Sequence, residues 1–265
     1  MKKKGKEFWI DLLFWVTLVA AAVPLLYAAG RIFVCDRFII KGYSMEPTLH
    51  TGTPVYVNKL ILGGRIYTKF DWESDTLHCF RMPGLRKLKV GDIAVYNYQY
   101  GTRRDTISFK INYVYAKRCV GCPGDTLSIV NGRYVNSSVA DVGVPESSQS
   151  RLSATPDSVL FESGGFRAGR FAGEKQRWTI KDFGPILVPG KGIEIQLDSV
   201  SRRHYAAVLR YETGQAPEKV VGDTYVFKNN YYFFAGDNVM NSRDSRYDGF
   251  VPEDFVVGVF KNRKR

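Results

Sequence analysis

The feature that most constrains this chain is an uncharged stretch near its start. Residues Leu12 to Ala29 run for 18 positions without an acidic or basic side chain. An α-helix needs about 20 apolar residues to cross the hydrocarbon core of a bilayer. Phe8 to Ile10 extend the apolar character towards the N-terminus, and Pro24 is tolerated in a spanning helix. The sequence therefore predicts one transmembrane helix within residues 1–30.

The charges around this stretch predict its orientation. Lysines at positions 2, 3, 4 and 6 precede it, and a single basic residue, Arg31, closely follows. Because basic flanks stay on the cytoplasmic side, we expect a cytoplasmic N-terminus in the inner or plasma membrane, with the rest on the outer, periplasmic side. A cleaved signal peptide is the alternative, since Tyr27 to Gly30 resembles a cleavage site. The stretch exceeds the usual 7–15-residue signal core, which favours an uncleaved anchor.

After this stretch the sequence predicts a mostly β fold. Short segments rich in β-branched and aromatic residues alternate with turn residues, and helical periodicity is scarce. Residues 137–176, rich in Ser, Gly and charge, are expected to form a long loop. The expected strands lie at 32–34, 37–40, 54–57, 91–98 (a turn and a strand), 107–120, 126–130, 133–135, 178–180, 186–188, 193–197, 206–211, 226–227, 231–234 and 255–260.

The net charge of +12 does not by itself indicate a nucleic-acid-binding protein. We find no zinc-ligand spacing, no RNA-binding aromatic signature and no helix-turn-helix pattern. We therefore expect a solvated basic surface near a membrane, and no nucleic-acid partner. Cys119 and Cys122 have the spacing of a redox or half-zinc motif. A structural zinc site needs about four ligands and no second pair follows. We expect two small thiols and no metal; the sequence leaves a disulfide open.

A short stretch around Ser44 predicts a rigid turn. Gly42 permits conformations that other residues resist, and Pro47 fixes its own φ and restricts the residue before it. Met45 and Leu49 are apolar and can anchor the turn to a core. Such a turn can hold a hydroxyl at the rim of a groove, although by itself an ordinary loop serine is the simpler interpretation.

Two distant stretches also carry reactive groups. Lys117 stands among apolar and aromatic residues, where it is either a snorkelling surface residue or a buried amine with a lowered pKa. Arg118 is expected to face solvent. The last stretch, 236–252, is dense in Asp, Asn, Ser and Arg; in it, Asp244 and Arg246 are expected to pair.

Together these stretches resemble the conserved boxes of bacterial type I signal peptidases, which are membrane-bound Ser–Lys proteases. Gly42 to Leu49 is similar to the nucleophile box, and Gly91 to Tyr96 to the next one. Lys117 to Asp125 resembles the lysine box, and Gly236 to Pro252 the last box. The order of the boxes and the preceding apolar stretch also match.

The resemblance implies a role for each candidate residue. Ser44 would be the nucleophile, its backbone N–H helping to hold the oxyanion, and Lys117 the general base. Ser242 would hydrogen-bond the lysine, while Asp244 and Arg246 would brace the site. The resemblance also implies no cofactor, and as partners preproteins bearing signal peptides and the lipid bilayer. We expect a monomer.

The resemblance further implies a domain division and a binding site. We expect a cytoplasmic tip and anchor at 1–30, a signal-peptidase-like β catalytic domain at 31–130 and 231–265, and an inserted β subdomain at 131–230. Shallow apolar pockets would admit the small side chains of an Ala-x-Ala signal sequence. The residues expected to line them are Phe38, Ile40, Met45, Tyr115 and Ala116.

The sequence departs from the family pattern at four positions. Gly42 stands where some members have a serine that supplies a second oxyanion donor. Val239 and Met240 stand where an Arg–Asp pair is common, and Asp248 where an aromatic residue is common. These departures predict weaker bracing and leave open a catalytically impaired relative or an anchored β-rich binding protein. Self-cleaving repressors, a soluble Ser–Lys class, are disfavoured by the apolar stretch.

The predicted orientation can be tested by proteolysis. Protease added outside spheroplasts should digest everything that follows residue 31, because that part is expected to lie outside the plasma membrane. Fragments would be followed by immunoblotting with tags at either end. Full protection of the C-terminal tag would contradict the orientation, and a mature N-terminus at residue 30 or 31 would contradict the uncleaved anchor.

Overall fold

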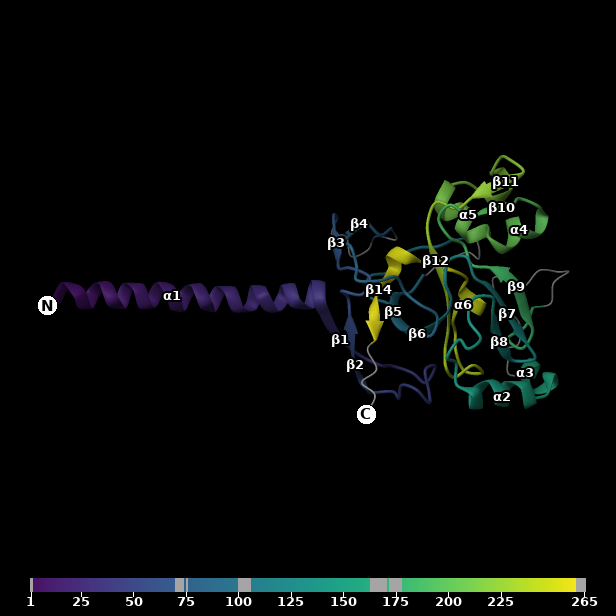
Figure 1. Cartoon of the computed structure of the whole chain (residues 1–265), viewed down its shortest axis with the longest axis horizontal. Helices are drawn as coiled ribbons and strands as arrows, with labels where there is room; N and C mark the ends of the chain where they lie inside the picture. Colours follow the sequence, from purple (N-terminus) through teal and green to yellow (C-terminus); the bar gives the residue numbers. More distant parts are fainter. Residues whose placement is uncertain are drawn as a thin grey trace.

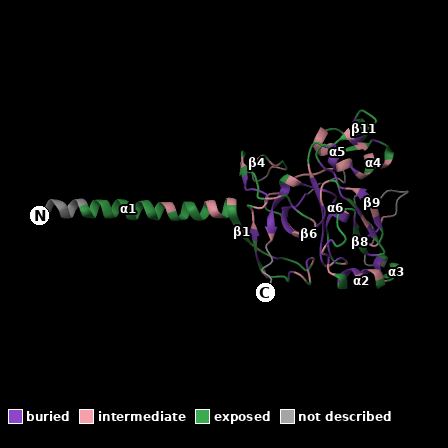
Figure 2. Ribbon diagram, viewed as in Figure 1, coloured by how far each residue is buried: buried purple, intermediate pink, exposed green. Residues whose placement is uncertain are grey.

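A long N-terminal helix stands apart from a β-rich body (Figure 1). The computed structural model describes residues 2–69, 74, 76–99, 106–162, 171 and 178–260. Helix α1, Lys2–Ala29, is exposed along almost all of its residues from 8 to 29 (Figure 2), and residues Phe8–Val34 are apolar enough to cross a membrane, with a mean hydropathy of 2.2. The expected strand at 32–34 is wrong, because a π-helical segment, Gly30–Val34, continues the helix.

A seven-stranded antiparallel sheet forms the centre of the described body. Its strand order is β1-β2-β14-β5-β6-β12-β13. Strands β5 and β12 are buried at every residue, which is why their sequences are almost continuously apolar or aromatic. The strands are β1 Cys35–Ile39, β2 Pro54–Asn58, β5 Ile93–Asn97, β6 Val114–Gly121, β12 Tyr231–Ala235, β13 Val251–Pro252 and β14 Val256–Phe260.

The expected long strand at 107–120 begins only at Val114. The preceding segment is held differently, because the Asn97 side-chain amide donates to the carbonyls of Lys110 and Ile111, at 3.1 and 3.0 Å. Pairing with β5 then starts opposite Asn97 and continues to Arg118. The segment before Val114 therefore folds back against the end of β5 instead of extending β6.

Three smaller sheets surround the central one. The largest has the order β8-β7-β9, and its β7–β8 turn uses Asn131 and Gly132, both with positive φ, as Asn-Gly hairpins do. The division expected at residue 130 falls in this turn, between two paired strands. The strands are β7 Thr126–Val130, β8 Arg133–Asn136 and β9 Phe183–Leu187, with the pairs β3 Arg65–Tyr67 and β4 Cys79–Arg81, and β10 Glu194–Gln196 and β11 Thr224–Val226.

Helices replace two of the expected irregular or extended segments. The strand expected at 206–211 is wrong: this segment is helical, buries Val208 and Leu209, and ends at Gly214 with φ +71°. The loop expected at 137–176 contains two helices; its residues 163–170 and 172–176 lie outside the described residues. The helices are α2 Glu146–Ala154, α3 Asp157–Glu162, α4 Ser199–His204, α5 Ala206–Thr213 and α6 Ser245–Asp248.

The central sheet curls so that distant strands face one groove. Strands β1 and β6 are separated by three strands in the sheet order, yet residues of both line the same cavity. The turn that follows β1 is anchored to the core, because Met45 and Leu49 pack in a buried cluster with Val55, Val95 and other residues of β2, β5 and β14. The curl thus brings the Ser44 turn beside β6.

Candidate active site

The turn that carries Ser44 is fixed from both sides. Its apolar side chains point into the core, with Met45 1% exposed. On the other side, Asn238 makes two hydrogen bonds to the turn. Its backbone N–H donates to the Ser44 carbonyl and its side-chain amide to the Tyr43 carbonyl, each at 3.1 Å. Gly42 has φ +82°, a region that favours glycine. The Ser44 hydroxyl is therefore held in one place at the edge of the sheet.

Lys117 projects from β6 towards this hydroxyl. The residue is only 3% exposed, and its Nζ lies in hydrogen-bond contact with Ser44 Oγ. The same Nζ donates to Ser242 Oγ at 3.1 Å and lies 5.7 Å from the centre of the Tyr115 ring. The structure thus places the amine between two serine hydroxyls from opposite ends of the chain.

Burial makes this amine unusually easy to deprotonate. The loss of hydration lowers the pKa of Lys117 from 10.5 to about 8, an effect that Asp244 opposes in part and Arg246 reinforces. A change of this size corresponds to about 3 kcal/mol between the charged and neutral forms. About one tenth of the amine is therefore in the neutral, proton-accepting form at pH 7, far more than for a lysine with a pKa of 10.5.

A second buried pair lies beside the lysine. The side chains of Asp244 and Arg246 are both 0% exposed and are joined by two hydrogen bonds of 2.9 and 2.8 Å. Burial alone would raise the pKa of Asp244, but the charge and hydrogen bonds of Arg246 outweigh it, so the pKa is lowered. The carboxylate also accepts from Gly236 N–H at 3.0 Å. The pair therefore ties the last stretch into one unit.

The positions that depart from the family pattern have contacts of their own. The backbone carbonyl of Val239 accepts from Arg246 Nη2 at 2.9 Å, a contact that needs no particular side chain at position 239. Asp248 accepts from Arg243 Nε and Nη2, each at 3.0 Å, and from the Tyr98 hydroxyl at 3.2 Å. A paired carboxylate thus occupies the position where an aromatic residue is common.

The expectation that Arg118 faces solvent is wrong. Its side chain is 12% exposed and makes two hydrogen bonds of 2.7 Å to Asp237, which is fully buried. Arg118 Nη1 also donates a hydrogen bond to the Gly91 carbonyl at 2.8 Å. Strand β12 ends its pairing with β6 at Ala235, opposite Arg118, and the chain reaches Asp237 two residues later, so a partner 119 residues away covers this side of β6. No local signal in the sequence indicates that partner.

Gly236 is required by close packing. A Cβ atom there would lie 2.1 Å from Ser242 Oγ and 2.5 Å from the Ser44 carbonyl oxygen. Neither of these oxygen atoms can move away unless the serine that carries it moves as well. The glycine therefore lets the last stretch approach the nucleophile turn closely enough for Ser242 to reach Lys117.

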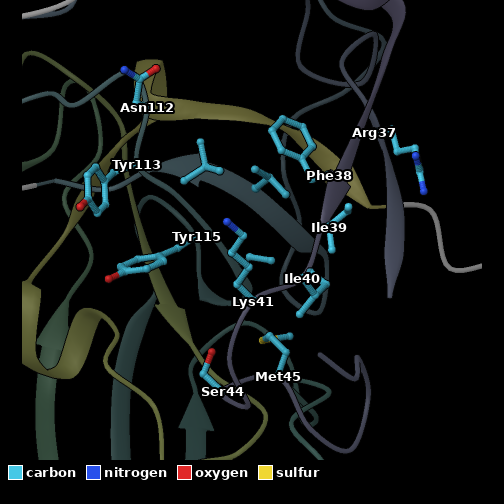
Figure 3. Close-up of a pocket in the computed structure, with 13 residues that line it drawn as sticks. Arg37, Phe38, Ile39, Ile40, Lys41, Ser44, Met45, Asn112, Tyr113 and Tyr115 are labelled. Carbon is cyan, nitrogen blue, oxygen red and sulfur yellow. The ribbon is translucent and has the colours of Figure 1, made fainter. Parts of the chain in front are cut away.

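A groove leads away from Ser44 along β1 and β6. Its volume is about 710 Å³, and Ser44 and Met45 lie at one end while Asn112 lies at the other (Figure 3). The walls come from residues 37–41 and 112–116. All five residues expected to form substrate pockets line it: Phe38, Ile40, Met45, Tyr115 and Ala116.

The two cysteines of the lysine box lie close together as free thiols. Cys119 is buried, Cys122 is half-buried, and their sulfur atoms are 3.8 Å apart. Each thiol also contacts a backbone carbonyl, Cys119 that of Gly121 and Cys122 that of Leu88. Neither thiol contacts Ser44, Lys117 or Ser242 among the interactions of the described residues.

The β fold and the contact between Ser44 and a buried Lys117 are those of a serine hydrolase of the Ser–Lys type. The chain belongs to the signal peptidase family, peptidase S26, whose model matches residues 10–263. It is 26% identical over 263 residues to signal peptidase I T of Bacillus subtilis (strain 168), covering 98% of this chain and 89% of that protein.

Other relatives carry the same family name. The chain is 24% identical to signal peptidase I of Bacillus amyloliquefaciens, covering 98% of this chain and 87% of that protein. Among solved structures it is similar to a signal peptidase I from Enterococcus faecalis V583, with 20% identity, a TM-score of 0.31, and 66% of this chain and 97% of that one covered.

The burial of Lys117 predicts a stability that depends on pH. The folded-state pKa, about 8, lies below the unfolded value of 10.5, so the cost of burying the charge is fully present below pH 8 and is relieved as pH rises towards 10.5. Lys117→Met should therefore be more stable to urea than wild type by about 2–3 kcal/mol at pH 6.5, with the difference closing near pH 10.

The matched control is Lys191→Met, which removes an exposed lysine. Its stability difference from wild type should be within about 0.5 kcal/mol at every pH. A Lys117→Met variant that is less stable than wild type at pH 6.5, or whose difference does not change with pH, would contradict a desolvated amine.

Proposed function

We propose that this chain is a serine endopeptidase that removes N-terminal signal peptides from exported preproteins, with Ser44 as nucleophile and Lys117 as general base. The observation that carries the proposal is the contact between the Ser44 hydroxyl and a buried amine whose pKa is lowered to about 8. Membership of the signal peptidase family and the names of the relatives support the same activity.

The geometry supports a proton route with two groups. The neutral amine of Lys117 accepts the proton of the Ser44 hydroxyl as Oγ attacks the scissile carbonyl carbon. The resulting ammonium then donates that proton to the nitrogen of the departing mature protein, which leaves an acyl-enzyme. In the second half, Lys117 takes a proton from water, the hydroxide attacks the ester, and the proton returns to Ser44 Oγ.

Ser242 orients the amine for both transfers. Its hydroxyl accepts an N–H from Lys117 at 3.1 Å, so the lone pair of the neutral amine is left for Ser44. The Ser44 backbone N–H has no acceptor within the described part of the chain, and we assign it to the oxyanion. With Gly42 in place of a serine, a second donor would be a backbone N–H or a water.

The groove suits an extended peptide. Strand β1 pairs only with β2, and β6 pairs with β12 only from Arg118 onward, so among the described strands the edges beside the groove are unpaired. An extended segment can add to such edges by backbone hydrogen bonds, and shallow pockets then select its side chains. We propose that Phe38, Ile40, Met45, Tyr115 and Ala116 admit the small residues of an Ala-x-Ala cleavage site.

The N-terminal helix indicates where in the cell this activity takes place. The family is membrane-associated, and helix α1 is long and apolar enough to cross a bilayer. We propose a single-pass protein with a cytoplasmic N-terminus, active as a monomer on the outer side of the plasma membrane. Residues 31–130 and 231–265 would form the catalytic domain around an inserted subdomain at 131–230. A signal peptide held in the same bilayer would present its cleavage site at that surface.

The alternative functions predict a different site. A catalytically impaired relative or an anchored binding protein needs neither a buried amine nor a hydroxyl against it. The lowered pKa of Lys117 carries a stability cost that a binding protein has no reason to retain. This cost favours the peptidase over both alternatives.

Substitution of the three central residues tests the proposal. Ser44→Ala and Lys117→Ala should each abolish cleavage of a synthetic preprotein, and Lys117→Arg should not restore it, because a guanidinium stays charged. Ser242→Ala should slow turnover by about 10- to 100-fold, as expected for one orienting hydrogen bond worth about 1–3 kcal/mol. The readout is kcat/KM, with folding checked by circular dichroism.

The control is Ser199→Ala, which alters an exposed serine at the start of α4. It should cleave at the wild-type rate. Near-normal turnover by a folded Lys117→Ala variant would overturn the mechanism, and so would strong inhibition by EDTA that zinc reverses.

The pH dependence of cleavage follows from the same amine. Activity needs neutral Lys117, whose pKa is about 8. The rate constant kcat/KM should therefore rise tenfold per pH unit below that value and level off above about pH 9, leaving about 1% of the plateau at pH 6. A rate that is flat between pH 6 and 9 would contradict Lys117 as the base.

A further inference from the structure

A second lysine reaches into the groove beside the nucleophile. The charged residues that line the groove are Arg37 and Lys41, and no carboxylate is among its lining residues. Figure 3 shows Lys41 extending into the space between Tyr113, Tyr115 and Phe38, whereas Arg37 points away from it. The groove therefore contains the ammonium group of Lys41 three residues before Ser44.

This ammonium group has no counter-charge in the described part of the chain. No ion pair or hydrogen bond joins Lys41 to another described side chain. The nearest carboxylates along the chain are engaged elsewhere: Asp36 pairs with Arg31 at 2.7 Å and with Lys59 at 3.3 Å, and Glu46 lies 3.6 Å from His50. The groove thus presents an unpaired positive charge.

We propose that Lys41 is a specificity-determining residue that selects preproteins with an acidic side chain in the segment bound along the groove. The inference rests on the proposed signal-peptide cleavage and adds a charge preference to the choice of small residues. Lys41 is exposed, so its attraction for a carboxylate acts at the solvent-accessible surface of the groove and is screened by salt. A basic side chain in the same place meets a like charge, so the groove also rejects it.

The side chain has the reach that such a role needs. A lysine ammonium sits on a flexible four-carbon stem with three donors, so it can follow a carboxylate without a fixed geometry. An anionic lipid headgroup offers similar chemistry, but Lys41 points inward between the groove walls instead of away from them as Arg37 does. The inward direction favours a group carried by the bound peptide.

The test is a charge scan of the substrate. Peptides with a small-residue cleavage site would carry Asp, Asn or Lys at single positions from five before the scissile bond to two after it. With wild type, the ratio of kcat/KM for Asp to that for Lys should reach about 10 at one or more positions and fall at 1 M salt. Lys41→Met should bring this ratio to about 1, and Lys41→Glu should reverse it.

Lys191→Glu is the matched control, because it changes the net charge equally on an exposed lysine outside the groove. It should keep the wild-type ratio. A wild-type ratio near 1 at every position, or the same ratio in Lys41→Glu as in wild type, would overturn the inference while cleavage itself continues. Failure of wild type to cleave the Asn peptides would instead overturn the proposed function, and the inference with it.

The lipid explanation is tested in the same series. The peptides would be cleaved in neutral detergent micelles and in vesicles with and without an anionic phospholipid. The inference predicts that residue 41 alters the Asp-to-Lys ratio in all three. An effect of residue 41 that appears only with the anionic lipid, and equally for Asp, Asn and Lys peptides, would overturn it.

Discussion

The structure depends on keeping one amine out of water. Lys117 is 3% exposed and contacts the Ser44 hydroxyl, and its burial lowers its pKa to about 8. Holding an amine in this state costs about 3 kcal/mol of stability below that pH, so other interactions must keep the site closed. Two buried ion pairs flank it, Asp244 with Arg246 and Arg118 with Asp237.

These interactions join three stretches that lie far apart in the sequence. Strand β6 supplies Lys117 and Arg118, and the last stretch supplies the partners of both. The same stretch, through Asn238, fixes the turn of Ser44, and the absence of a side chain at Gly236 allows the close approach. The distance between nucleophile and base therefore depends on all three stretches.

The sequence predicted the mostly β fold and the apolar helix. It also predicted Ser44 and Lys117 as candidate residues, because the conserved boxes that contain them occur together and in order. It did not predict the inward direction of Arg118, since strand alternation assigns a side and cannot reveal a partner 119 residues away. It also missed α5, because Val208 and Leu209 are β-branched or apolar residues typical of strands, whereas tertiary packing favours a helix there.

The most direct test of the account is the ionisation of Lys117 itself, measured without reference to turnover. The protein would be labelled at lysine with ¹³C and ¹⁵N, and the Lys117 signal assigned by its loss in Lys117→Met. The side-chain resonances would then be followed from pH 6 to 11 in micelles. The account predicts a titration midpoint near 8, well below the 10.5 of an ordinary lysine. A midpoint at 10 or above would leave almost no neutral amine at physiological pH and would contradict its role as the base.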